Sequence, residues 1–213
     1  SAQGIAGKAR RTVDEFEVQL ELAESFAAED RALAKIEEMG KAGAIQGIHG
    51  RMSDLVTFRR ALGTCLEATS AGWMKALVVE DMETAKRCIE SLKRTKLGRI
   101  KVIPVRDLRS VRAVRRPAEA GVLGVAASFV RCAASLRPVV NFVFGDTLVA
   151  ESNEIALQLS HDGYRAVTVD GDVYEAQGVV ESGFYRRPVN LAQLIPSDEH
   201  VSSLNAAVAK LEV

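Results

Sequence analysis

Acidic residues and glycines alternate in one stretch of the sequence, residues 169–183, which reads VDGDVYEAQGVVESG. Such a stretch permits three kinds of site: a glycine loop around a phosphate, an acidic metal loop, or backbone that comes close to another chain. The chain has no phosphate loop of the GxxxxGK[ST] type. Asp170, Asp172 and Glu175 lack the spacing of a calcium loop, and a tight turn at Asp170-Gly171-Asp172 explains the first two. We therefore expect Gly178 and Gly183 to permit close backbone approach, because glycine has no Cβ.

The remaining polar residues do not predict catalysis. His49, His161 and His200 stand in unrelated contexts, and no serine lies in an elbow motif. The cysteines, at positions 65, 88 and 132, have no CxxC or His-rich neighbour, so they indicate neither disulfides nor a zinc site. We expect buried thiols in a reducing compartment, with no catalytic residue, metal or cofactor. A small-molecule enzyme is the least favoured class.

Charge is strongly segregated although the net charge is zero. Acidic residues dominate residues 14–38, and basic residues dominate residues 93–116. The basic residues are Lys93, Arg94, Lys96, Arg99, Lys101, Arg106, Arg109, Arg112, Arg115 and Arg116. Arginine binds phosphate through two hydrogen bonds, so this basic segment could bind nucleic acid. The alternative is a solvated face that pairs with the acidic first helix or with acidic partners, and no aromatic residue lies among these arginines to stack on bases.

Helices are expected at both ends of the chain. Residues 10–39 contain no proline and no internal glycine, and Leu33 and Ile36 belong to an apolar stripe at helical spacing. Beyond Pro196, an apolar heptad pattern runs from Val201 to Leu211. We expect these two helices to pack on each other as a coiled-coil-like arm.

The middle of the chain contains the same pattern twice. In each copy a short apolar strand, residues 76–79 or 147–150, precedes a helix capped by Asp81 or Ser152. A second strand comes after each helix, at residues 100–105 and 166–169, which makes two β-α-β units. GIHGRMSDLV at residues 47–56 aligns with GVLGVAASFV at residues 121–130. We expect an α/β fold of two similar mixed-sheet halves.

These motifs, in this order, resemble the hinge domain of structural-maintenance-of-chromosomes (SMC) proteins. The resemblance runs through GIHGRMSDLV, ALVVEDMETAKRCIESLK, KLGRIKVIPVRDLR, GVLGVAASFV, FGDTLVAES and YRAVTVDGDVYEAQGVVESG, over roughly residues 45–183. It implies a two-subdomain α/β module between the antiparallel arms of a coiled coil. The implied boundaries are residues 1–43 for the first arm, 44–118 and 119–189 for the subdomains, and 190–213 for the second arm.

The resemblance also implies partners. It implies a homodimer, or a heterodimer with a second SMC-like hinge, that binds DNA or RNA, has no membrane partner and has no catalytic activity of its own. The implied interface residues are Gly121, Gly124, Gly178, Val179, Val180, Ser182 and Gly183. The nucleic-acid residues are the basic segment and a second patch at Arg186 and Arg187. Ser182 stands where the family commonly has the first of two glycines.

The C-terminal residues 186–213 resemble the subgroup in which a hinge comes after a GHKL-type ATPase module. That subgroup acts in chromatin silencing and DNA repair in eukaryotes. We accordingly expect a nuclear, chromosome-bound protein if the source is eukaryotic and a nucleoid protein otherwise. No apolar run approaches the roughly 20 residues that cross a bilayer.

Overall fold

The structure is a computed structural model that describes residue 24 and residues 27–96, 98–108 and 114–182. The described residues divide between two compact units, and the larger unit, Leu33–Lys96 and Ile100–Tyr185, contains all the labelled helices and strands. Both predicted halves therefore belong to the same compact unit. The predicted C-terminal helix lies outside the described residues.

The first half begins with a helix at residues 27–41. There follow β1 (Ile48–Arg51), α2 (Met52–Leu55), β2 (Val56–Phe58), η1 (Arg60–Leu62), α3 (Gly63–Thr69), η2 (Trp73–Lys75), β3 (Leu77–Val79), α4 (Met82–Thr95), β4 (Val102–Pro104) and η3 (Val105–Asp107). The second half contains β5 (Val122–Val125), η4 (Ala126–Phe129), β6 (Val130–Cys132), η5 (Ala134–Leu136), α5 (Arg137–Phe144), β7 (Thr147–Ala150), α6 (Asn153–His161), β8 (Arg165–Thr168), β9 (Val173–Tyr174) and β10 (Val180–Glu181). This is the predicted mixed α/β fold.

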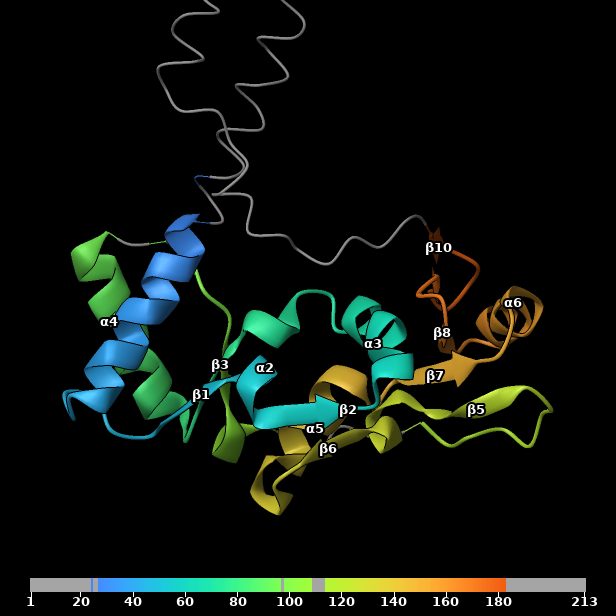
Figure 1. Cartoon of the computed structure of the whole chain (residues 1–213), viewed down its shortest axis with the longest axis horizontal. Helices are drawn as coiled ribbons and strands as arrows, with labels where there is room; N and C mark the ends of the chain where they lie inside the picture. The colour runs from blue at the N-terminus through green and yellow to red at the C-terminus, as the bar shows by residue number, and fades with distance from the viewer. Residues whose placement is uncertain (1–23, 25–26, 97, 109–113, 183–213) are drawn as a thin grey trace, which may run out of the picture. The chain divides into compact units, whose positions relative to one another are not determined.

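The internal duplication is confirmed by the strand pairing. In the first half β1 pairs antiparallel with β3, which pairs parallel with β4. In the second half β5 pairs antiparallel with β7, which pairs parallel with β8. β9 and β10 extend the second sheet to the order β10-β9-β8-β7-β5. Figure 1 shows α4 beside the first sheet and α6 beside β7 and β8 of the second.

Both halves repeat an irregularity as well as a topology. The register shifts between Ile48 and Gly50 in β1, and between Val122 and Gly124 in β5. The glycine before each strand, Gly47 or Gly121, has a left-handed φ of 89° or 82°. Its carbonyl accepts a hydrogen bond from the backbone N–H of the residue directly after the paired strand, Glu80 after β3 or Glu151 after β7. A feature so detailed is expected when two copies derive from one ancestral unit.

The helix caps are those that the sequence predicts. Asp81 accepts a hydrogen bond of 2.9 Å from the backbone N–H of Thr84, and this bond lowers the pKa of the Asp81 carboxyl. Ser152 accepts from the backbone N–H of Ile155 at 3.5 Å at the start of α6. A side-chain oxygen at this position satisfies an N–H group that has no partner within the helix.

The first helix packs within the larger unit from Leu33 onward. Leu33 and Ile36 are fully buried, as the predicted stripe requires. Glu37 forms a two-pronged ion pair with Arg51 of β1, at 2.7 and 3.1 Å. Figure 1 shows this helix beside α4, and Ser91 of α4 donates a hydrogen bond to the sulfur of Met39.

The two halves share one core through the strands β2 and β6. These strands pair antiparallel, with Val56 opposite Cys132, Thr57 opposite Arg131, and Phe58 opposite Val130. One hydrophobic cluster includes Met52 and Val78 from the first half together with Val149 and Val167 from the second. The halves therefore fold as one body around this junction, because a core shared in this way cannot be divided without exposing apolar surface.

The cysteines provide a test of this packing. Cys65 and Cys88 are fully buried, as predicted, and burial raises the pKa of the Cys65 thiol to about 11. Cys132, on the short strand β6, is only half-buried. Because the thiolate is the reactive form, we expect a thiol reagent at pH 8 to modify Cys132 at least about tenfold faster than Cys65 or Cys88.

The measurement is alkylation with iodoacetamide over time, followed by peptide mass spectrometry. The control is the same reaction in about 6 M guanidinium chloride, in which the rates should converge as the chain unfolds. Equal rates in the native protein would show that the core around Cys65 opens readily.

Candidate interface and nucleic-acid surface

The strand β10 forms one edge of the five-stranded sheet (Figure 1). Among the described residues it pairs on one side only, with Val180 opposite Tyr174 and Glu181 opposite Val173. Val179 is 65% exposed and Val180 is 44% exposed, whereas Val167 and Val173 in the neighbouring strands are buried. An edge strand with exposed apolar residues presents unpaired backbone groups that a further strand can pair with.

The turn predicted at Asp170-Gly171-Asp172 is confirmed. Gly171 has a φ of 101°, and its N–H donates to the carbonyl of Thr168. The N–H of Thr168 donates in turn to the carbonyl of Asp172, which closes the hairpin between β8 and β9. Burial first, and then the negative charge of Asp172, raises the pKa of the neighbouring Tyr174. These residues organise the sheet edge, and no metal cluster occurs among the described residues.

Gly178 lies in the turn between β9 and β10. It has a φ of 91°, and its N–H donates to the Ser160 hydroxyl at 2.9 Å. The N–H of Glu175 donates to the carbonyl of Val179 across this turn. The turn by itself accounts for a glycine here, because residues with a Cβ rarely adopt this backbone conformation. Participation of Gly178 in an interface remains a prediction.

The other residues of the predicted interface lie at separate places. Ser182 comes directly after β10 and donates a 2.6 Å hydrogen bond to Asp172. Gly121 and Gly124 are at β5, the opposite edge of the same sheet. A Cβ at Gly121 would clash with Ile155 Cδ1, and one at Gly124 would stand 3.2 Å from the ring of Phe129. Both glycines therefore have contacts within the chain. Gly183 lies outside the described residues.

Part of the basic segment is exposed and has no acidic partner in the described part of the chain. Lys93 and Arg94 lie in the last turn of α4, and Lys96 terminates this helix in a left-handed conformation. Cations at the end of a helix interact favourably with its negative end. These three residues form the free part of the predicted basic surface. Arg99 and Arg115 are also exposed, each in a connection between elements.

Other members of the segment make specific contacts. Arg106 forms an ion pair with Glu80 at 2.5 Å while its side chain is 70% exposed. Lys101 donates to the carbonyl of Ala71 and lies 4.7 Å from the ring centroid of Trp73. Arg116 donates to the carbonyl of Val122 at 2.6 Å. These three side chains hold their segments to other parts of the chain. Their charge alone does not reveal these contacts. Arg109, Arg112, Arg186 and Arg187 lie outside the described residues.

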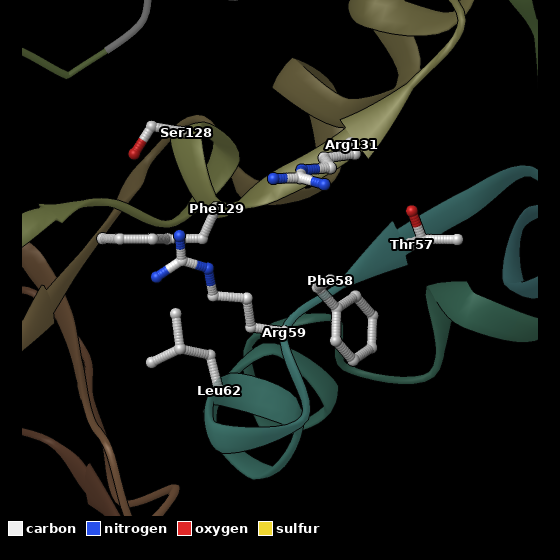
Figure 2. Close-up of a pocket in the computed structure, with 7 residues that line it drawn as sticks. All are labelled: Thr57, Phe58, Arg59, Leu62, Ser128, Phe129 and Arg131. Atoms are coloured by element: carbon white, nitrogen blue, oxygen red, sulfur yellow. The ribbon is translucent and has the colours of Figure 1, made fainter.

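Two further cations, Arg59 and Arg131, lie outside the basic segment, and the sequence does not predict that they come together. They line one pocket with Phe58 and Phe129 (Figure 2). Arg131 belongs to β6, and Arg59 directly follows β2, the strand that pairs with β6. The only signal was an aromatic residue near an arginine in VTFRR and SFVR. That signal becomes a site only when the pairing of β2 with β6 is known.

The fold and its surfaces define a class: an internally duplicated α/β module with a free strand edge and exposed cations. The sequence matches the family described as "SMC proteins Flexible Hinge Domain" over residues 45–160. The chain belongs to the SMC hinge domain family, which confirms the resemblance. No helix in the described part of the chain is both long and apolar enough to cross a membrane.

Several relatives are chromosome partition Smc proteins. The chain is 35% identical to that of Aquifex aeolicus over 170 residues, 79% of this chain and 15% of that protein. It is 31% identical to that of Methanocaldococcus jannaschii over 185 residues, 82% of this chain and 15% of that protein. The chain thus spans about 15% of the length of these relatives.

Solved structures have the same fold. The asymmetric dimer of the Geobacillus stearothermophilus SMC hinge domain matches with a TM-score of 0.66 at 21% identity, covering 99% of this chain and 91% of that chain. The Pyrococcus furiosus SMC hinge domain matches with a TM-score of 0.61 at 26% identity, covering 78% of this chain and 91% of that chain.

The contacts of Gly121 can be tested by substitution. Gly163→Ala introduces a Cβ at a similar φ of 85° with nothing within 4 Å, so it should cost about 1 kcal/mol of unfolding free energy. Gly121→Ala should cost about 1 kcal/mol more, because Ile155 must leave its rotamer. Urea denaturation measures both. If Gly121→Ala leaves stability equal to that of the control but changes the oligomeric state, the glycine serves an interface.

Proposed function

We propose that this chain is a dimerising hinge that joins an SMC protein to a second copy of itself or to a related hinge. The observation that carries the proposal is the free apolar edge at β10, where Val179 is 65% exposed. An edge strand can pair with its equivalent across a two-fold axis, since antiparallel pairing makes the contact self-complementary. That a related hinge from Geobacillus stearothermophilus was solved as a dimer supports the same conclusion.

The full-length protein, we propose, acts in chromosome partition at the nucleoid or chromosome. Relatives named chromosome partition protein Smc, in bacteria and in an archaeon, support this role. The resemblance of residues 186–213 to the GHKL-ATPase subgroup, with its silencing and repair roles and nuclear location, remains a prediction from sequence. We propose no catalytic role for this chain.

The hinge is also proposed to bind DNA or RNA through the free part of the basic surface. The support is chemical: Lys93, Arg94 and Lys96 are exposed and have no ion-pair partner in the described part of the chain. Binding them to phosphates would release counterions without breaking any ion pair of the described residues. The competing proposal is a module that contacts only proteins, in which these cations meet acidic partners. A mobility-shift assay at low salt separates the two, because the protein-only module gives no shift.

The dimer proposal predicts the effect of charge at the edge. Val179→Asp/Val180→Asp should yield a folded monomer, because two buried carboxylates at each edge would repel those of the partner. Size-exclusion chromatography with light scattering, at roughly 10 to 100 µM so that a micromolar dimer is populated, measures the mass.

The control is Leu157→Asp, at a residue of α6 that is 41% exposed and does not belong to β10. It should remain dimeric. A wild-type chain that is monomeric throughout this range would refute the dimer, and a dimeric double variant would move the interface away from β10.

The nucleic-acid proposal predicts a loss that depends on position. Lys93→Glu/Arg94→Glu/Lys96→Glu should weaken binding at least about tenfold and reduce the slope of log K against log salt by roughly 2 to 3, because three phosphate contacts are lost. The matched control is Lys41→Glu/Arg60→Glu/Lys86→Glu, which makes the same change of net charge at exposed sites elsewhere. Fluorescence anisotropy with labelled DNA at several salt concentrations measures both. Equal losses would show that net charge alone governs binding.

A further inference from the structure

A pocket of about 310 Å³ lies where the two halves meet. From the first half, residues of β2, of η1 and of the connection between them line it, namely Thr57, Phe58, Arg59 and Leu62. From the second half, Ser128 and Phe129 of η4 and Arg131 of β6 line it. Figure 2 shows the side chain of Arg59, from the residue that connects β2 to η1, and the side chain of Arg131, from β6, both lining the pocket with Phe129. The pairing of Thr57 with Arg131 fixes the distance between the two walls.

The pocket carries positive charge that nothing in its lining balances. No Asp or Glu lines it, and neither Arg59 nor Arg131 has a hydrogen-bond or ion-pair partner in the described part of the chain. Both residues are exposed, so their guanidinium groups are accessible. Other arginines of the same unit are engaged: Arg51 binds Glu37 and Arg165 binds Glu175. Two unpaired guanidinium groups at one pocket favour an anion that accepts hydrogen bonds from both.

The rest of the lining favours a flat apolar group next to that anion. Phe58 and Phe129 are half-buried, which leaves part of each ring accessible, and Leu62 adds an aliphatic surface. The Ser128 hydroxyl donates to the carbonyl of Val125 at 2.6 Å, so its oxygen remains available as an acceptor. A nucleotide combines these features, because it joins a planar base to a phosphate. Bases stack on aromatic rings while arginine neutralises the backbone.

We propose that this pocket binds one unpaired nucleotide of a single-stranded nucleic acid. The phosphate lies between Arg59 and Arg131, and the base lies against the accessible face of Phe129. A base inside a duplex is stacked and paired on all sides and cannot enter such a pocket without being unstacked. This site rests on the proposed function in one respect, namely that the chain binds nucleic acid. It uses none of the residues of the basic segment.

The experiment measures binding of a fluorescein-labelled oligothymidylate of about 15 nucleotides by fluorescence anisotropy. This length is close to the longest single strand, about 16 nucleotides, that one OB-fold domain covers. Arg59→Ala/Arg131→Ala should raise Kd at least about tenfold and reduce the salt slope by roughly 0.7, because the one phosphate between these arginines is no longer neutralised. The charge-matched control Arg60→Ala/Lys86→Ala should stay within about twofold, because these exposed residues do not line the pocket. Blunt duplex of the same length should respond equally to both pairs.

A second variant separates stacking from charge. Phe129→Leu should raise Kd about fivefold or more with an unchanged salt slope, because it removes the aromatic face and no cation. Because Phe129 also packs against the core, the thermal unfolding of the Phe129→Leu variant is measured as well. If this variant does not fold, photocrosslinking of a 5-iodouracil oligonucleotide to the wild-type protein, mapped by mass spectrometry, should identify Phe129 or Phe58.

Three results would overturn the site. Equal losses in the two arginine pairs would leave only general electrostatic attraction. Displacement of the strand by thymidine monophosphate at equal nucleotide concentration would assign the pocket to a free nucleotide. Displacement by an acidic peptide but not by unlabelled strand would assign it to a protein.

The same assay keeps this site distinct from the basic surface. If Lys93→Glu/Arg94→Glu/Lys96→Glu abolishes binding and Arg59→Ala/Arg131→Ala has no effect, this site falls while the proposed function stands. The reverse result retains the site and refutes the basic surface.

Discussion

The pairing of β2 with β6 is the constraint on which the rest of the structure depends. Each strand has three residues, too few to form a stable sheet alone. Their stability comes from the buried residues Val56 and Val130, which face a core that both halves supply. Aligning the halves as the repeat requires places Thr57 on Arg131, and these two residues are also opposite each other in the ladder. The pseudo-two-fold axis therefore passes through this pair, and each half completes the core of the other.

The repeated glycines show why each half keeps its shape. Gly47 and Gly121 begin their strands with a left-handed φ, which bends the chain so that the bulge and the first hydrogen bond can form. At Gly47 a Cβ would stand 2.9 Å from Thr84 Oγ1, and at Gly121 it would meet Ile155. The contacted residue is in the first turn of the helix in both cases. Glycine is thus required for the close packing of strand on helix, before any partner chain is considered.

The sequence predicts what is local and misses what is assembled at a distance. Asp81 and Ser152 each cap a helix by accepting a hydrogen bond from the backbone N–H three residues later in the chain. A short window of sequence therefore contains the whole interaction. The strands at residues 77–79 and 147–150 are continuous apolar runs and are likewise predictable. The pairing of β2 with β6 cannot be predicted in this way. The two strands lie far apart in the chain, and three residues are too few to show a periodic pattern.

The same reason limits prediction of the candidate sites. Lys101 and Arg106 are counted as free cations in the sequence, but Trp73 and Glu80, which approach them, are brought there by the fold. Arg59 and Arg131 belong to separate segments and become one pocket only through the strand junction. Charge composition therefore predicts that a basic surface exists, and tertiary structure decides which of its members remain free.

The two halves carry different features on the same scaffold, and this difference separates the proposed dimer edge from the proposed basic surface. After β8 the chain turns at Gly171 and adds β9 and β10, so the second half ends in an apolar edge. After β4 the chain forms η3 and enters the basic connector. Duplication supplies two equivalent scaffolds. The second carries a strand edge after β8, and the first carries the free cations Lys93, Arg94 and Lys96 at the end of α4. Because the edge and these cations lie on different halves of a shared core, either can change without disturbing the fold that holds the other.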